Sequence, residues 1–269
     1  MLLTSVIIVL REVLEAALLI SILSALSVAH GIRRGWIGWA LLCGMTAAVG
    51  LGYGIDTVSA WFDGVGQEVS SAVLQFGIYA LLLLLLVLLG RPGAGGREIR
   101  LWGVLMAAVV ALALTREGFE VLVYVLGFAG SLKQLLVVLL GSAIGAGIGI
   151  SIGALIYYLL RSLPRLPAQA LGLVLVVLVA AGLLSQAALL LIQADWLPAQ
   201  LPLWDSSALI GEDTVTGQLL YAMIGYEATP TAIQAGFYFG GGALMLAAGL
   251  FSVLRHHNML QHAAGSGAP

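Results

Sequence analysis

The chain has 269 residues, of which 61% are hydrophobic and only 9% are charged, and its formal net charge is −2. Soluble domains carry about 25% charged residues, so this composition excludes a soluble globular domain and predicts an integral membrane protein. The one cysteine, Cys43, excludes an intramolecular disulfide framework, and we expect no nucleic-acid partner.

Apolar runs of the roughly 20 residues that a helix needs to cross a bilayer occur seven times. The expected spans cover residues 2–29, 36–59, 69–90, 101–129, 132–160, 168–194 and 231–254. The first run has no basic segment before it, so we interpret it as a retained span and not as a cleaved signal peptide. The sequence therefore predicts an all-α protein with a single transmembrane domain over residues 1–254 and a tail over 255–269.

Basic residues between the spans predict the orientation. Eight arginines fall on one side of the predicted bilayer, while the other side carries only Lys133. The eight are Arg33, Arg34, Arg91, Arg97, Arg100, Arg161, Arg165 and Arg255. Because cytoplasmic loops are enriched in Lys and Arg, we expect the N-terminus outside, the tail in the cytoplasm, and the chain in the cytoplasmic (inner or plasma) membrane as a multi-pass protein.

Two copies of an R-E-x-x-E motif lie inside these apolar runs. They comprise Arg11, Glu12 and Glu15 in the first span and Arg116, Glu117 and Glu120 in the fourth. On a helix the three charged residues of each copy fall within an arc of about 100°. Both copies lie about 15–21 Å below the outer end of their span, near the midplane. A charge at that depth costs about 2.5–3.5 kcal/mol, so we expect the two copies to meet.

The first and fourth spans run in opposite directions, which indicates an inverted repeat of spans 1–3 (residues 1–90) and 4–6 (residues 99–194). Small residues recur at every fourth position of spans 2 and 5, namely Ala40, Gly44, Ala48 and Gly52, and Gly141, Gly145, Gly149 and Gly153. Such stripes let helix backbones approach closely in lipid. Three glutamines in spans 3 and 6 are expected to form interhelical hydrogen bonds: Gln75, Gln186 and Gln193. The seventh span lies outside the repeat.

The charges of the two motifs favour a cation site. Four glutamates and two arginines sum to −2, which one divalent cation would neutralise. Carboxylate oxygens are hard ligands that suit Mg, Ca, Mn or iron-like ions, and the absence of His and Cys from both motifs argues against zinc or copper. An Arg–Glu network that only joins the two helices, or a proton relay through the glutamates, would use the same residues.

The outer loop, residues 195–230, is the only sizeable polar segment, and residues 215–225 are expected to form a short helix over the mouth of the path. Its acidic residues are Asp205, Glu212, Asp213 and Glu227. They could concentrate cations before entry, or they could simply be a solvated surface.

The paired motifs resemble those of the high-affinity, oxidase-dependent iron permease family, which includes fungal ferric permeases and bacterial EfeU-type permeases. The segment WDSSALIGEDTVTGQLLYAMIGYEATPTAIQ, residues 204–234, also resembles the family's segment before its last span, and the resemblance extends to about residue 255. One departure is Val13, which stands where the second copy has Gly118. We expect this position to point away from the acidic face.

The resemblance implies a permease and not an enzyme. Iron, as Fe²⁺ or Fe³⁺, would be the transported substrate, with no cofactor, and an extracytoplasmic oxidase or iron-binding protein would be the partner. Glu12, Glu15, Glu117 and Glu120 would bind and pass the metal, with Arg11 and Arg116 as charge-balancing partners.

Other functions remain open at this point. The chain could transport another divalent metal such as Mn or Pb, or it could be a membrane sensor or scaffold that binds metal without passing it. An intramembrane hydrolase is disfavoured because there is no H-E-x-x-H motif or nucleophile signature. No phosphate-binding GxxxxGK[ST] motif is present, so energy would come from ion gradients or from chemistry on a partner.

Overall fold

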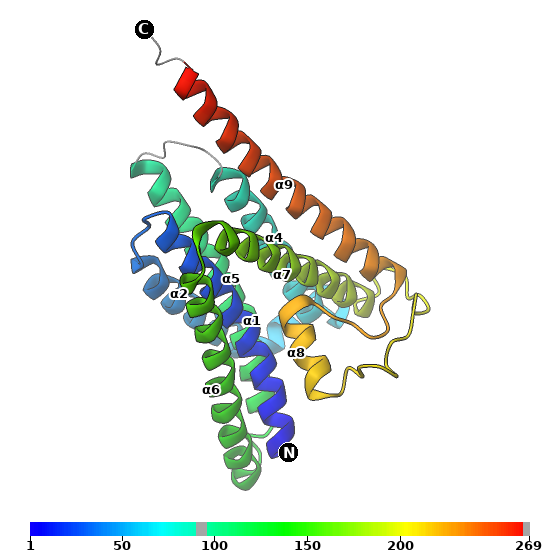
Figure 1. Cartoon of the computed structure of the whole chain (residues 1–269). Helices are drawn as coiled ribbons and strands as arrows, with labels where there is room; N and C mark the ends of the chain where they lie inside the picture. The colour runs from blue at the N-terminus through cyan, green and yellow to red at the C-terminus, as the bar shows by residue number, and fades with distance from the viewer. Residues whose placement is uncertain (90–95, 266–269) are drawn as a thin grey trace.

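The computed structural model describes residues 1–89 and 96–265, and this part of the chain is helical (Figure 1). Its helices are α1 (Leu2–Ala29), α2 (Gly35–Tyr53), α3 (Ile55–Ser59), the 3₁₀ helix η1 (Trp61–Gly64), α4 (Gly66–Leu89), α5 (Gly96–Leu126), α6 (Leu132–Ser162), α7 (Arg165–Gln193), α8 (Val215–Ile224) and α9 (Ala232–Gly265). Within the described ranges there is no β-strand, only an isolated antiparallel bridge between Pro202 and Thr231.

In the described part, six helices are long and apolar enough to cross a membrane: α2, α4, α5, α6, α7 and α9. Helix α1 is not among these six. It has 28 residues, or about 42 Å, and it carries the three charged residues of the first motif. The predicted all-helical class is confirmed, with six membrane-length apolar helices.

One predicted boundary is wrong. The second span was expected to reach residue 59, but α2 ends at Tyr53, and the chain then forms α3 and η1. Gly54, with φ −91° and ψ 11°, leaves the helical conformation and separates α2 from α3; further on, Phe62 and Asp63 of η1 have positive φ angles of 54° and 63°. The apolar part of α9, Ala232–Ser252, agrees with the predicted seventh span; the helix continues to Gly265 within the predicted tail, and residues 266–269 lie outside the described residues.

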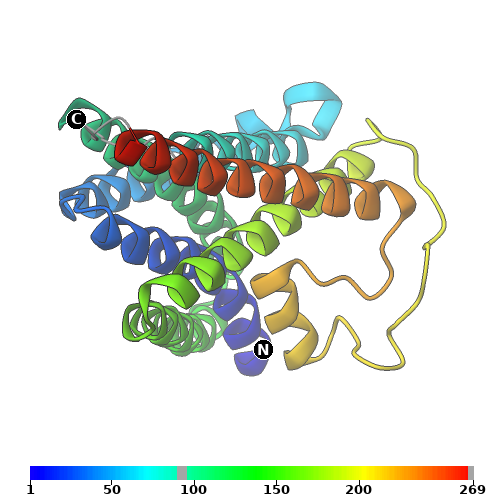
Figure 2. The same cartoon turned by 45° about the horizontal axis from the view of Figure 1, so that its top comes forward.

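Helix α1 and the six membrane-length helices pack in a crossed pattern (Figure 2). Helix α1 packs along α6, α2 along α5, and α4 contacts α5, α7 and α9. Hydrogen bonds join α4 to α7 and α9. Gln75 Nε2 of α4 donates to Gln186 Oε1 of α7 at 2.8 Å, and the Tyr79 hydroxyl of α4 donates to the Gly241 carbonyl of α9 at 2.8 Å. The interhelical hydrogen bond is confirmed for this glutamine pair, whereas Gln193 is exposed at the end of α7.

The two stripes of small residues are the packing surfaces of these pairs. All eight predicted positions are buried. A Cβ added at Gly44 would lie 2.7 Å from Leu114 Cβ of α5, and one at Gly145 would lie 2.9 Å from the backbone nitrogen of Leu10 of α1. Ser21 of α1 also donates to the Gly153 carbonyl at 2.7 Å. The predicted close approach is therefore confirmed, and it fixes α1 tightly against α6.

A matched pair of substitutions on α6 tests this contact. We expect Gly145→Val to destabilise the protein by about 1–3 kcal/mol, because the new side chain overpacks the α1 interface. Gly147→Val is the control, since a Cβ at Gly147 meets no atom within 4 Å. Thermal unfolding of the purified variants in detergent measures the difference, and equal midpoints would contradict a tight α1–α6 contact.

Candidate functional site

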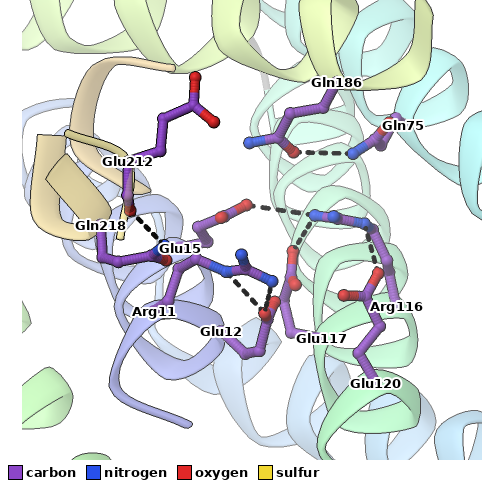
Figure 3. A network of polar contacts seen from close by, with 10 residues as sticks. All are labelled: Arg11, Glu12, Glu15, Gln75, Arg116, Glu117, Glu120, Gln186, Glu212 and Gln218. Atoms are coloured by element: carbon purple, nitrogen blue, oxygen red, sulfur yellow. Dashed lines mark hydrogen bonds and ion pairs between the residues drawn. The ribbon is translucent and has the colours of Figure 1, made fainter. Parts of the chain in front are cut away.

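The charged residues of the two motifs face each other between α1 and α5 (Figure 3). Arg116 is at the centre of the network. Its Nη1 donates to Glu117 Oε1 at 2.6 Å and to Glu15 Oε2 of α1 at 3.1 Å, and its Nε lies 3.3 Å from Glu120 Oε1. One buried guanidinium is therefore shared by three glutamates and joins α1 to α5, as the matched depth of the motifs predicted.

The second arginine is placed differently. Arg11 forms an ion pair with Glu12 next to it, with Nε donating to Glu12 Oε1 at 2.8 Å. Its guanidinium carbon also lies 5.2 Å from the ring centre of Tyr221 in α8, a distance typical of a cation–π contact. The Arg11 side chain is 28% exposed, against 6% for Arg116, so only Arg116 depends entirely on its acidic neighbours.

Three of the four glutamates could share one ion. One carboxylate oxygen each from Glu12, Glu117 and Glu120 lies within 4.8 Å of the others. Oxygens that each bind a hard cation at about 2.0–2.6 Å can be separated by up to about twice that distance. In the described ranges this is the one group of three or more His, Cys, Asp or Glu side chains placed so closely. Glu15 belongs to the same ion-pair network but lies outside this trio.

Several carboxylate oxygens in the site lack a hydrogen-bond donor. Glu12 Oε2, Glu15 Oε1 and Glu117 Oε2 are buried without a partner, although the other oxygen of each group contacts an arginine. A buried acceptor left unsatisfied costs about 1–3 kcal/mol, and more when it is charged. With four acids to two arginines, the arrangement suits a bound cation or proton.

The third position of each motif faces a neighbouring helix instead of the acids, as expected. Val13 packs on α6, where its Cγ1 lies 3.0 Å from the place of a Cβ on Gly149. In the second copy, a Cβ on Gly118 would lie 3.0 Å from Ala48 Cβ of α2. In the first copy the larger side chain, Val13, is on the motif helix and the glycine is on the partner helix α6. In the second copy the glycine is on the motif helix and the larger side chain, Ala48, is on the partner helix α2. This exchange explains the departure at Val13 without any effect on the acidic face.

The acidic residues of the outer loop mainly bind the loop itself. Asp205 accepts hydrogen bonds from the backbone and hydroxyl of Ser207 at 2.9 and 2.5 Å, which lower its pKa. Glu212 Oε1 accepts from the backbone nitrogens of Ala228 and Thr229 at 2.7 and 3.2 Å.

Glu227 is a partly buried member of the same loop. Burial raises the pKa of its carboxyl group, against the opposing effect of a 2.6 Å hydrogen bond from Gln234 Nε2. Asp213 is exposed. The structure does not gather these four carboxylates into a cluster, so cation capture by the outer loop stays a prediction.

Two residues near the acids were not predicted as part of the site. A small cavity of about 10 Å³ lies beside them, bounded by α1, α5, α7 and α8. Its lining includes Glu15, Glu117, Gln186 and Tyr221, and its volume is close to that of one water molecule. For Gln186 an interhelical hydrogen bond was expected in preference to a ligand role, and Tyr221 lies in an apolar segment without any charge pattern, so neither could be assigned to the site without the fold.

Comparison with known proteins gives one match. No curated protein and no solved structure matches the chain. The sequence profile described as the iron permease FTR1 family matches residues 98–235, just over half of the chain, and this region includes the second motif and helix α8. The chain therefore belongs to the iron permease FTR1 family, a family of multi-pass membrane transporters whose substrate is iron.

Proposed function

We propose that the protein carries iron inward across the cytoplasmic membrane through the acidic centre formed by the two R-E-x-x-E motifs. The observation that carries this proposal is the set of buried, unpartnered oxygens on Glu12, Glu15 and Glu117. Iron would exchange waters for oxygens of Glu12, Glu117 and Glu120, with Glu15 beside them and the two arginines as fixed counter-charges. An inside-negative potential favours inward movement by about 2.3 kcal/mol per charge per 100 mV.

In this proposal α1 is a seventh span, with the N-terminus outside and the tail inside. Its length supports this assignment. So does Figure 1, where the N-terminus and the C-terminal end of α9 lie at opposite ends of the helical body, as an odd number of crossings requires. The eight arginines counted above favour the same orientation.

The packing supports an inverted repeat of residues 1–90 and 99–194 within one transporter domain, 1–254. If α1, α2 and α4 correspond to α5, α6 and α7, then the α1–α6 contact corresponds to the α5–α2 contact. Each motif helix thus packs on the glycine-rich helix of the other repeat. The two repeats would meet where α1 contacts α5 and α4 contacts α7, with the acids at that junction.

Uptake by the purified protein in liposomes tests the function. With an inside-negative potential we expect saturable uptake of radiolabelled iron above that of empty liposomes. An excess of Mn²⁺ or Pb²⁺ should compete weakly, because the family transports iron. Strong competition would favour the alternative divalent substrate, which the −2 charge sum also suits. Metal binding without flux would identify a sensor or scaffold. By resemblance to the family, an extracytoplasmic oxidase or iron-binding protein would deliver the metal.

A further inference from the structure

Helix α8 is a short apolar helix within the loop of residues 195–230. It has 10 residues, about 15 Å of helix, which is too short to cross a membrane. The chain before and after it returns to the same place, because Leu203 donates to the Pro230 carbonyl at 2.8 Å and Ser206 to the Ala228 carbonyl at 2.9 Å. The loop is therefore a folded hairpin with α8 at its tip, and in both views α8 lies beside the N-terminal half of α1 (Figures 1 and 2).

The tip of this hairpin reaches the acidic centre. Helix α8 contacts α1 and α7, and its Tyr221 stacks on Arg11 and lines the cavity beside Glu15 and Glu117. At its C-terminal end the helix closes with Gly225 at φ +66°, in backbone contact with Gly182 of α7. A Cβ on Gly182 would lie 2.9 Å from Gly225 Cα. Two glycines thus let α8 sit directly on α7, with Tyr221 in the wall of the cavity.

The opposite side of the acidic centre is closed by the helix core. Toward the C-terminal end of α1 and the N-terminal end of α5, the residues next to the acids are apolar and fully buried, among them Leu18, Val109, Val110 and Ala113. The acidic centre is thus bounded by this apolar layer on one side and by α8 on the side of Glu15 and Glu117, while the Glu120 side chain is 28% exposed. Since α8 is joined to the bundle by loop segments at both ends, it is the cover that can move without unpacking a membrane-length helix.

We propose that α8 is the outer gate of the acidic centre and that the Tyr221 ring closes it. The cavity behind the ring is then the entry compartment, from which a cation passes to the glutamates. Gln186 and Glu15 would receive the ion first, and Glu117 would connect this compartment to the trio with Glu12 and Glu120, because it belongs to both. This proposal rests on the proposed function for its direction, but the gate itself can be tested without iron.

The test measures how fast a cysteine behind the gate reacts. In a Cys43→Ser background, Leu183→Cys places the only thiol on the cavity lining. A charged, membrane-impermeant methanethiosulfonate reagent is added to right-side-out vesicles that contain the full chain. We expect slow modification with Tyr221 present, and modification about tenfold faster after Tyr221→Ala, which removes the ring and its cation–π contact. Tyr221→Phe keeps the ring and should keep the slow rate.

Matched controls separate the gate from a general loss of structure. Tyr53→Ala removes a tyrosine that is 90% exposed and should not change the rate. Leu209→Cys, a reporter at a side chain that is 87% exposed, should react equally fast with and without Tyr221. Gly225→Ala is a second gate variant: its methyl group would collide with Gly182 and lift α8 without removing the ring. It should also accelerate modification at Leu183→Cys, whereas Gly236→Ala, with open space around it, should not.

Unchanged rates in both gate variants, or a Tyr221→Phe rate as high as that of Tyr221→Ala, would overturn the proposal. Because no iron is present in this assay, its result is independent of the transport function. If the modification rates respond as expected but liposomes show no iron flux, the result supports the gate and contradicts the proposed iron transport. If iron flux is normal and the modification rates do not respond, the result supports transport through the acidic centre and contradicts the gate.

Discussion

Replacing Glu117 with glutamine is expected to reduce iron uptake by at least about tenfold, the equivalent of 1.4 kcal/mol. Glu117 belongs to the trio of close oxygens, receives the 2.6 Å hydrogen bond from Arg116, and lines the cavity next to α8. Glutamine keeps the size and one oxygen but removes the charge, so the change tests cation binding and not packing. Initial rates of uptake in liposomes at equal protein density are the measurement.

The same change at Glu12, Glu15 and Glu120 should also reduce uptake at least tenfold. Glu12 and Glu120 belong to the trio, and Glu15 adds an unpartnered oxygen beside it. Glu68→Gln, in the first turn of α4 and outside both motifs, is the control and should transport normally. Near-normal uptake by all four motif variants would exclude the acidic centre as the iron path.

The meeting of α1 and α5 could be predicted from the sequence because charge in a bilayer leaves few solutions. Two charged motifs at the same depth either pair with each other or expose their charges to lipid. Pairing costs less free energy than exposure to lipid. What could not be predicted is how one arginine divides its contacts. Arg116 reaches across to Glu15 while Arg11 stays with Glu12 and turns toward Tyr221. That choice depends on side-chain rotamers and on α8, neither of which a motif encodes.

The glycine stripes show a second limit of the same kind. Their four-residue spacing predicted close helix contacts, but not which helix each stripe would meet. In the fold Gly145 meets α1 and Gly44 meets α5, a crossed arrangement that follows from complementary surfaces on both partners. The boundary error after Tyr53 has a simpler origin, since hydrophobic residues continue past the helix end in α3 and η1, and the break falls at Gly54, whose backbone (φ −91°, ψ 11°) is not helical.

Removal of the central counter-charge should have the largest effect on stability. Arg116→Met keeps the length and apolar stem of the side chain but leaves Glu15 and Glu117 buried without a cation. Breaking a buried ion pair by removing one partner costs about 3–5 kcal/mol, so we expect a large decrease of the thermal midpoint in detergent. Arg116→Lys keeps the charge but lacks the planar fork that donates to three carboxylates. Its thermal midpoint should therefore lie between those of the parent protein and Arg116→Met.

Arg11→Met is the matched control, because the same residue type in the other copy is 28% exposed and contacts one glutamate. Its destabilisation should be clearly smaller than that of Arg116→Met. If the acids form a cation site, Mn²⁺ or Fe²⁺ should raise the midpoint of Arg116→Met more than that of the parent protein, since the metal supplies the missing positive charge and binding to the folded state stabilises it. Equal midpoints for the two arginine variants would contradict the central role of Arg116. A midpoint that no metal raises would show that the acids need an arginine at this point and that a metal ion cannot replace it.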